Sequence, residues 1–386
     1  MSIREVFRII YAPQKAFKKI IQEPGYKGPL IIMLLFVLSF SGFYSVLSAK
    51  VYYDQTAPKL TDLDKWTEDA SLWHSKDAKI FINTSDYIQG NYYGNKSIQF
   101  VLENSSRIDM ELRIPESLNC LEPYNYTSLS FRIKIIEPLK NPATVGIYLY
   151  SGYATDKYFN YLMEGDALEV NVWSNKTIPL TNFINVGEAD WRNITSLKFV
   201  LTWTSDENIK VLVDGVFFHG FYISMFEMNG SGIIANFIVS GFMQFTIQWV
   251  ILSIILYLFS KLFRGQPVWK TMLSISGFVL ITLFVQNLIL TGVVLAYPEM
   301  RLSLETLGGV QGEGWTADAQ NFMWILTIKY DILDRIVYFV WIVALCSVAF
   351  HLLFEFSWAR SVSVSFLSSI VSMLAFRFLI YGAVWL

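Results

Sequence analysis

Long uncharged apolar stretches constrain the fold of this chain more than any other feature. The first, residues 29–49, reads PLIIMLLFVLSFSGFYSVLSA. A helix of about twenty apolar residues crosses the hydrocarbon core of a bilayer. Four more apolar stretches follow a long polar section, at about 232–260, 272–297, 336–354 and 362–386. The pattern predicts an α-helical membrane bundle of five transmembrane helices, with one large polar domain between the first and second spans.

The overall composition supports the same class. Of 386 residues, 53% are hydrophobic and only 16% are charged, a balance that soluble domains do not show. The net charge of −2 gives no reason to expect nucleic acid or an acidic partner.

Residues 1–28 combine apolar positions at helical spacing with basic ones. Six basic residues precede the first span: Arg4, Arg8, Lys15, Lys18, Lys19 and Lys27. Basic amphipathic helices of this kind lie in the headgroup region, and the positive charge keeps the amino end in the cytoplasm. Two ordinary surface helices would need a soluble domain to cover. A cleaved signal peptide fits poorly, because the leading region and the apolar run are too long.

The charges of the later loops agree with this orientation. Residues 261–270, KLFRGQPVWK, are basic and are expected on the cytoplasmic side. The loop 298–335 is net acidic and is expected outside, with a helix from about Thr316 lying at the interface. Five spans then place the carboxyl end outside, and residues 229–386 hold spans two to five.

Every Asn-x-Ser/Thr triplet of the chain lies in or at the edge of the polar section. Such a triplet accepts an N-linked glycan only on the exterior side. We expect this section to be glycosylated, against the alternative of accidental triplets in a polar, loop-rich domain. The seven acceptors are Asn83, Asn95, Asn104, Asn125, Asn175, Asn193 and Asn229.

The exterior section, residues 50–228, has the period-two pattern of strands with one buried face. In SLSFRIKII, for example, Phe131, Ile133 and Ile135 alternate with polar residues. About nine or ten such runs are separated by Gly, Asn, Pro and Asp turns, and at that number an antiparallel β-sandwich is expected.

The ends of this section resemble galactose-binding-like jelly rolls, the sandwich of many carbohydrate-binding modules. The shared features are an early Trp, a Gly-rich turn before the strand that begins SIQF, and a last strand with Asp214-Gly215 followed by aromatic residues. The resemblance implies an all-β jelly roll inserted between spans one and two. It carries over no ligand residue.

The apolar part resembles the Yip-domain family of five-span membrane proteins, named for their interaction with Ypt/Rab GTPases. The supporting segments are YAPQKAFKKIIQEPGYKGPL, WVILSIILYLFSKLFRGQPVWKTMLSISGF and LDRIVYFVWIVAL. Most members have a short connection where this chain inserts a large domain. The role of the eukaryotic members in membrane traffic does not transfer, since no Rab partner is expected.

The two cysteines, Cys120 and Cys346, lie in sections of different environment and are not expected to pair. A glycosylated exterior without a disulfide suggests an archaeal cell surface, because domains exported through an oxidising secretory pathway often carry such bonds.

No metal-ligand array, nucleophile motif or phosphate loop occurs in the sequence, so no catalytic residue, metal or cofactor is expected. Polar residues within spans are functional or helix-pairing candidates. Arg377 is expected to pair with Glu299 or Asp331 rather than to serve transport. The carboxamide candidates within spans are Gln244, Gln248, Gln286 and Asn287.

Aromatic residues concentrate in the middle of the exterior section. Those at alternate strand positions, such as Tyr148 and Tyr150, are expected in the core. Near a Gly- and Asp-rich turn, others are candidates for stacking on sugar rings. These ligand-binding candidates are Tyr153, Tyr158, Tyr161 and Trp173.

These patterns predict a non-enzymatic plasma-membrane protein of the cell envelope. Its jelly roll would bind surface glycan or a glycoprotein, while its spans contact lipid. The alternatives are an accessory subunit of a membrane complex and, third, a transporter or lipid-modifying protein.

Overall fold

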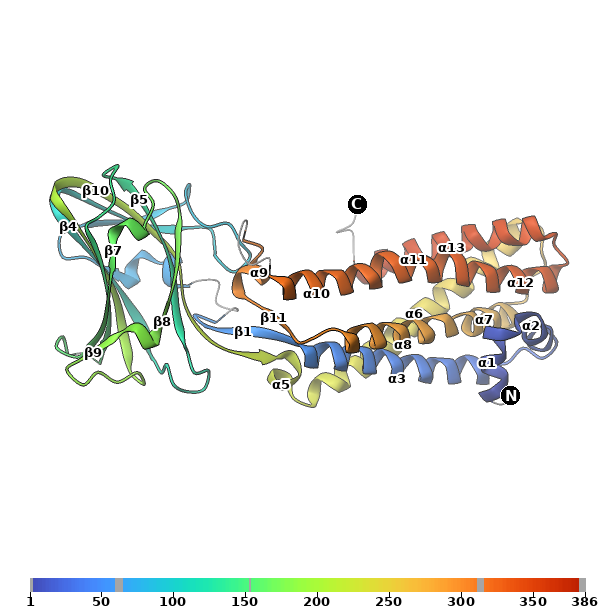
Figure 1. Ribbon diagram of the computed structural model, residues 1–386. Helices are drawn as coiled ribbons and strands as arrows, with labels where there is room; N and C mark the ends of the chain where they lie inside the picture. The colour runs from blue at the N-terminus through green and yellow to red at the C-terminus, as the bar shows by residue number, and fades with distance from the viewer. Residues whose placement is uncertain (1–2, 60–64, 153, 311–315, 382–386) are drawn as a thin grey trace. The chain divides into compact units, whose positions relative to one another are not determined.

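The computed structural model describes residues 3–59, 65–152, 154–310 and 316–381 (Figure 1). The chain forms two compact units. The helical unit contains residues 1–51, 224–300 and 320–386, and the sandwich unit contains residues 52–223 and 301–319. Each unit has a hydrophobic core of its own.

Five helices of the described chain are long and apolar enough to cross a membrane, which agrees with the expected number. The third is interrupted at Leu280. The five are α3 (Lys27–Lys50), α6 (Gly232–Leu262), α7 (Trp269–Val279) with α8 (Ile281–Ala296), the helix from Ala317 to Phe354, and α13 (Trp358–Tyr381).

The fourth long helix begins at Ala317, close to the helix start expected at about Thr316, but it continues to Phe354, whereas the sequence suggested a separate span from 336. Its successive segments are α10 (Ala317–Thr327), a π-helix (Ile328–Leu333), α11 (Asp334–Ile336), a second π-helix (Val337–Ile342) and α12 (Val343–Phe354). The acidic residues that suggested a loop include Asp334, whose side chain is paired within the helical unit. The pairing partners are distant in sequence, so a local count of charges separated the interfacial helix from the span that it joins.

The amino-terminal helices α1 (Ile3–Tyr11) and α2 (Pro13–Gln22) form as the periodicity predicts. Their apolar side chains are not free to enter lipid, however. Val6, Ile9, Phe17 and Ile20 are buried in the core of the helical unit. The same apolar stripe that suits a membrane surface suits a protein surface, and α7 and α12 provide one.

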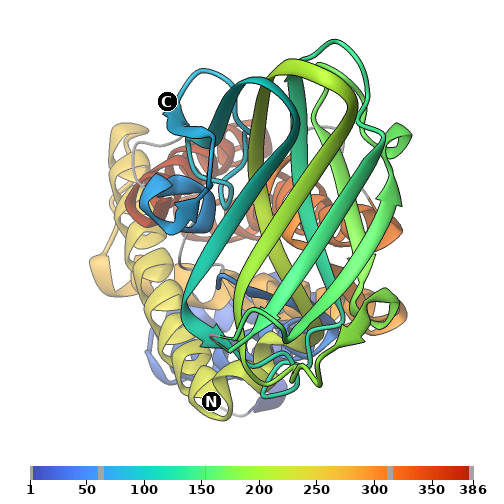
Figure 2. The same ribbon diagram turned by 90° about the vertical axis from the view of Figure 1, so that its left-hand side faces the viewer.

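The sandwich unit contains strands that connect into one hydrogen-bonded network in the described chain. Two of them, β4 (Ser97–Leu118) and β10 (Ile194–Ser224), are long and bend from one layer into the other, as Figure 2 shows. The bend lies at the register shifts between Thr202 and Ile209. The other strands are β1 (Val51–Ala57), β2 (Trp73–His74), β3 (Lys79–Asn83), β5 (Ser128–Glu137), β6 (Thr144–Ser151), β7 (Tyr158–Glu164), β8 (Ser174–Pro179), β9 (Ile184–Val186) and β11 (Met300–Leu302).

The two halves of β10 define the layers. Its first half pairs with β4 on one side and β6 on the other, and β7 and β9 follow. Its second half pairs with β4 and β5, followed by β8, while β3 extends this layer beyond β4. Alternate residues of both layers, such as Phe199 and Phe131, meet in one core, as the period-two pattern predicts. The antiparallel β-sandwich is confirmed.

A segment far along the chain completes the sandwich unit. Residues 301–319, expected to belong to an exterior loop between spans, contain α9 (Leu304–Gly308). Leu304 and Val310 pack on Tyr93 and Phe217, on the outer side of the second layer. The domain is therefore discontinuous in sequence, and the expected bounds 50–228 omit part of it.

Candidate functional site

Three tyrosine rings lie together on the outer side of the first layer. In β6, the aliphatic residues Ile147 and Leu149 point into the core, so Tyr148 and Tyr150 point out. Tyr158 of β7 lies opposite Tyr150. The Tyr158 ring centroid is 5.7 Å from that of Tyr148 and 5.8 Å from that of Tyr150. We call Tyr148, Tyr150 and Tyr158 the tyrosine face. The expectation that Tyr148 and Tyr150 belong to the core is wrong.

Charged side chains border the tyrosine face on its β10 and β4 side. Lys198 lies between Tyr148 and Glu111 in the strand register. Its Nζ is 2.8 Å from Asp109, which also accepts a 2.9 Å hydrogen bond from Arg107. Burial opposes the ionisation of Asp109, but these bonds outweigh it and lower its pKa. The face is therefore bordered by fixed donors and acceptors.

Burial is the largest cause that raises the pKa of Tyr150. Its hydroxyl therefore stays protonated at neutral pH and is available as a hydrogen-bond donor.

Apolar side chains border the other side of the face. Leu162 is 62% exposed and Ile184 is 67% exposed. Ile184 of β9 lies opposite Asn160 in the register, and Asn160 lies opposite Tyr148. The face thus joins aromatic, apolar and charged groups on neighbouring strands.

The four ligand-binding candidates from the sequence do not form one site. Tyr158 belongs to the tyrosine face, but Tyr161 lies three residues further along β7, on the opposite face of the strand, and packs inward against Phe183. Trp173 donates a 2.9 Å hydrogen bond to Asp86 on the second layer. Tyr153 lies outside the described residues. The alternation of ATVGIYLY shows two faces, one aliphatic and one aromatic, and this signal could have identified Tyr148 and Tyr150.

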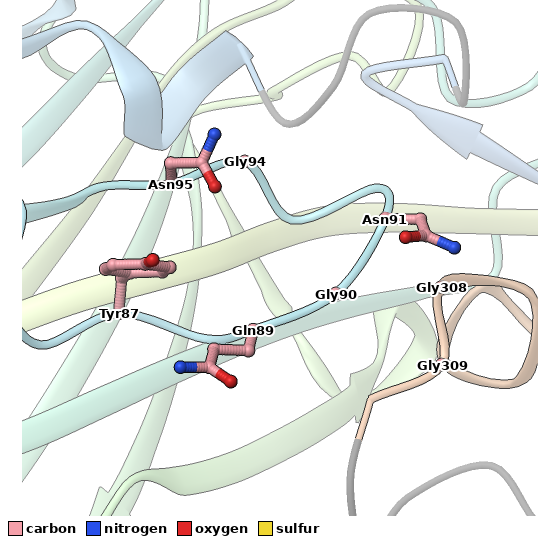
Figure 3. Close-up of a pocket in the computed structure, with 8 residues that line it drawn as sticks. All are labelled: Tyr87, Gln89, Gly90, Asn91, Gly94, Asn95, Gly308 and Gly309. Carbon is pink, nitrogen blue, oxygen red and sulfur yellow. The ribbon is translucent and has the colours of Figure 1, made fainter. Parts of the chain in front are cut away.

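A second polar surface is a pocket of about 440 Å³ beside the loop 87–95. Its side chains are Tyr87, Gln89, Asn91 and Asn95, and four glycines complete the lining (Figure 3). The Asn91 backbone N–H donates to the Gly308 carbonyl at 2.8 Å. Because Asn95 is also a predicted glycan acceptor, a glycan there would begin at the wall of this pocket.

A buried charge cluster lies on the outer side of the second layer. Arg132 is fully buried, stacks on the Tyr93 ring at 4.6 Å, and has Glu305 at 3.6 Å. Asp214 lies opposite Arg132 in the register. Gly215 permits this approach, because its φ is +56° and a Cβ there would lie 2.6 Å from Arg132 Nη1. The Asp214-Gly215 pair seen in the sequence therefore has a packing role.

The pKa values of two carboxyls in this cluster, Asp214 and Glu305, are shifted in opposite directions. Burial raises the pKa of Asp214 to about 7, despite hydrogen bonds from the Ile88 N–H at 2.7 Å and from Thr67 at 3.0 Å. Burial also opposes the charge of Glu305, but His219 and Arg132 outweigh it and lower its pKa.

A serine, a histidine and an aspartate also form a chain of contacts. The Ser130 Oγ is 2.6 Å from His219 Nε2, and His219 Nδ1 is 2.6 Å from Asp54 Oδ2. The order matches that of a nucleophilic triad. However, Ser130 is 1% exposed and its backbone is paired with both β10 and β8. The geometry therefore ties β1, β5 and β10 together. No local pattern indicates this arrangement, because Asp54, Ser130 and His219 are far apart in the sequence.

None of the seven glycan acceptors is buried. Asn229 is the last residue of the short helix α5 (Met225–Asn229), and the other six lie in strands or in the loops between them. Asn104 lies at the bend of β4 with a positive φ, as does Asn125 in its turn. Asn83 is half-buried, and its side chain donates to Gln99 at 3.0 Å.

The polar candidates of the spans come together in the helical unit. Gln244, Gln248, Gln286, Asn287 and Arg377 all line one cavity of about 70 Å³. Arg377 lies 3.8 Å from Asp334, not beside the expected Glu299 or Asp331.

Lys329 and Asp334 line the same cavity, and sequence reasoning missed both. The four-residue spacing of Tyr330, Asp334 and Tyr338 would have placed them on one helix face.

The described residues hold no group of three metal-ligating side chains. Cys120 and Cys346 are both buried and free, in separate units.

No protein-family model and no curated protein matches the chain. The resemblance to the Yip-domain family therefore stays a prediction. Solved structures similar to part of the chain include a family 11 carbohydrate-binding module from Clostridium thermocellum, in complex with a β-1,3-1,4-mixed-linked tetrasaccharide. It is 16% identical, with 40% of this chain and 91% of the module covered and a TM-score of 0.29.

A family 30 carbohydrate-binding module of the same organism is 13% identical, with 40% and 91% covered and a TM-score of 0.30. An exo-β-agarase is 13% identical, with 40% of this chain and 24% of the enzyme covered and a TM-score of 0.31. Similarity at this level assigns no ligand to this chain.

Proposed function

We propose that this chain is a non-enzymatic, membrane-anchored glycan-binding protein that displays its sandwich unit outside the cell. The tyrosine face carries the proposal. Three half-buried tyrosine rings on neighbouring strands, bordered by Lys198 and Glu111, offer the two kinds of contact that a sugar needs.

The chemistry follows from the two sides of a sugar ring. Its C–H groups pack on an aromatic ring, which supplies a large contact area at low conformational cost. Its hydroxyls exchange hydrogen bonds with polar side chains at the border. An open sheet face, unlike a closed pocket, admits a saccharide within a longer chain. The proposed ligand is therefore an oligosaccharide or polysaccharide of the cell surface.

The membrane placement is supported by the five long apolar helices and by the basic residues before α3 and after α6. The glycan acceptors agree with it, since six of the seven precede α6 within the sandwich unit. We propose that this unit is glycosylated and exterior, with the amino end cytoplasmic. An archaeal plasma membrane fits a glycosylated exterior that lacks a disulfide.

The test uses the full chain purified in mild detergent. A glycan array identifies the ligand, and calorimetry then measures its affinity for wild type and for the double variant Tyr148→Ala/Tyr158→Ala. Because two stacking surfaces are lost, we expect affinity to fall by about tenfold or more, equivalent to about 1.4 kcal/mol.

The matched control is Tyr87→Ala, which removes an aromatic ring from the pocket at loop 87–95 and leaves the tyrosine face intact. Its affinity should equal that of wild type. Loss of binding in the Tyr87 variant alone would place the ligand in that pocket. The absence of any sugar binding at millimolar concentration would refute the proposal.

The exposed Leu162 and Ile184 beside the face favour a second candidate, an accessory subunit of a membrane complex. In that case a partner protein covers these side chains. Native-size measurement in mild detergent separates the two, because a subunit co-purifies with its complex and a monomer that runs alone excludes this candidate.

A further inference from the structure

A polar cavity lies among the apolar helices of the helical unit. It has a volume of about 70 Å³, and α3, α6, α8, the helix from Ala317 to Phe354 and α13 all contribute to its lining. Its polar side chains include Gln248, Gln286, Asn287, Lys329, Asp334 and Arg377. Polar groups are costly among apolar helices unless they are paired or serve a ligand.

The carboxylate of the cavity already has partners. Gln286 Nε2 donates to Asp334 Oδ1 at 2.5 Å, and Arg377 Nη2 lies 3.8 Å from Asp334 Oδ2. Lys329 donates to the Tyr44 hydroxyl, and its Nζ lies 4.4 Å from the centroid of that ring. Asp334 is the single carboxylate among the described lining residues, so Lys329 and Arg377 share its negative charge.

The charges of the cavity therefore do not balance. The lining holds two cations, Lys329 and Arg377, against the single carboxylate of Asp334. A resident excess of positive charge repels a cation and attracts an anion, and it does so more strongly where water is excluded.

One acceptor in the cavity also lacks a donor. Gln248 is 2% exposed, and its Oε1 accepts no hydrogen bond from any residue that the structure describes. A buried carbonyl oxygen without a hydrogen-bond donor has lost its hydration without replacement, which destabilises the folded protein. A bound group with an O–H or N–H would remove this cost.

We propose that this cavity binds a phosphate group. A phosphate anion compensates the positive charges of Lys329 and Arg377. The hydroxyl of free phosphate, or a hydroxyl of the alcohol esterified to a lipid phosphate, donates a hydrogen bond to Gln248 Oε1. The volume holds on the order of five water-sized groups at roughly 10–15 Å³ each, which suits the five heavy atoms of a phosphate. The source is either the headgroup of an anionic lipid or free phosphate.

The surroundings of Arg377 favour the lipid. Its side chain is 45% exposed, so the cavity reaches the surface of the helical unit at this residue. The neighbouring exposed side chains on α13, Leu374 and Phe378, are apolar. A lipid could place its phosphate at Arg377 and its acyl chains along these residues. This choice of source rests on the proposed membrane placement, whereas the phosphate chemistry does not.

The experiment uses the full chain in detergent and measures bound adducts by native mass spectrometry and melting temperature by thermal scanning. The three probes are short-chain phosphatidylglycerol, phosphatidylcholine with the same chains, and inorganic phosphate. We expect phosphatidylglycerol to bind and to raise the melting temperature more than phosphatidylcholine does. Protection by inorganic phosphate without lipid would support the phosphate chemistry and assign the site to a soluble anion.

The variants locate the binding. Arg377→Gln should weaken binding of the preferred probe by about tenfold or more. The matched control is Arg360→Gln on the same helix, because Arg360 stacks on Phe356 outside the cavity. The control should bind like wild type. Equal binding by both variants, or no preference for any phosphate probe, would overturn the proposal.

Gln248→Leu gives a second readout that does not depend on removing a charge. Without the buried acceptor, the ligand-free protein should melt at the same or a higher temperature, while the preferred probe binds more weakly. Higher stability with unchanged binding would show that Gln248 does not face the ligand and would count against the site. Neither result depends on sugar binding at the tyrosine face.

Discussion

Burial raises the pKa of Asp214, whereas its hydrogen bonds lower that pKa. The carboxyl accepts bonds from Ile88 and Thr67 and lies opposite Arg132, yet burial raises its pKa to about 7. The folded sandwich unit therefore holds a proton that the unfolded chain releases near pH 3.8. Because protonation and folding are linked, the contribution of Asp214 to the free energy of unfolding decreases as pH rises from 3.8 to about 7. Above about pH 7 this contribution is constant.

Asp214→Asn tests this shift. The melting temperature of wild type minus that of the variant should decrease from pH 5 to 7 and remain level from 7 to 8, because only wild type has this proton to lose. The measurement is a thermal scan of the full chain across this range.

Asp109→Asn is the control for the Asp214 substitution. The pKa of Asp109 is lowered, so its contribution is lost only as pH falls below the usual range of an aspartate. The melting temperature of wild type minus that of Asp109→Asn should be constant from pH 5 to 8. A constant difference for Asp214→Asn as well would contradict the raised pKa.

Helix packing depends on small residues where α3, α6 and α7 meet. A Cβ at Gly277 would lie 2.5 Å from Pro29 and 2.7 Å from the Trp249 Nε1. That indole N–H donates to the Leu273 carbonyl at 2.7 Å, so the ring is not free to move away. A glycine in these positions lets neighbouring helices approach closely.

We expect Gly277→Ala to destabilise the helical unit by about 1–3 kcal/mol through overpacking. Gly42→Ala in α3 is the matched control, because a Cβ there meets no atom within 4 Å. The control should be neutral or stabilising by about 0.5–1 kcal/mol, since alanine favours a helix. Melting temperatures in detergent compare the two, and an equal effect of both substitutions would exclude close packing as the cause.

At the scale of the whole molecule, the sandwich unit is assembled from two separate parts of the chain. Residues 301–319 bring Leu304 and Val310 onto Tyr93 and Phe217. The same segment brings Glu305 to the buried Arg132. The inserted section alone would expose apolar side chains and leave Arg132 with one acceptor fewer.

A fragment of residues 52–223 should therefore melt at a lower temperature than the same fragment joined to residues 301–319 by a flexible linker. Each buried aliphatic side chain contributes about 1.5–3 kcal/mol, so the loss of Leu304 and Val310 is large enough to measure. Circular dichroism melting provides the comparison. Identical melting of the two fragments would show that the second segment adds no stability.

The architecture was predictable where it depends on local patterns. Uncharged runs of about twenty residues identified the long apolar helices, because length and apolarity are properties of the segment itself. Alternation in runs such as SLSFRIKII identified the strands, and the core positions Phe131, Ile133 and Ile135 are buried as expected. Five polar residues of the spans were also identified, whereas Lys329, Asp334 and the common cavity were not.

Tertiary structure decided which face is buried and which charges are paired. Period two divides ATVGIYLY into two faces, but only the opposing layer determines that Ile147 and Leu149 enter the core and that the tyrosines face outward. The local sequence placed Asp334 in a loop, whereas the structure places Gln286 and Arg377 beside its carboxylate. The sequence alone determined segments and periodicity, because these are local. Faces, partners and the two-part sandwich depend on contacts between distant residues, which no local pattern contains.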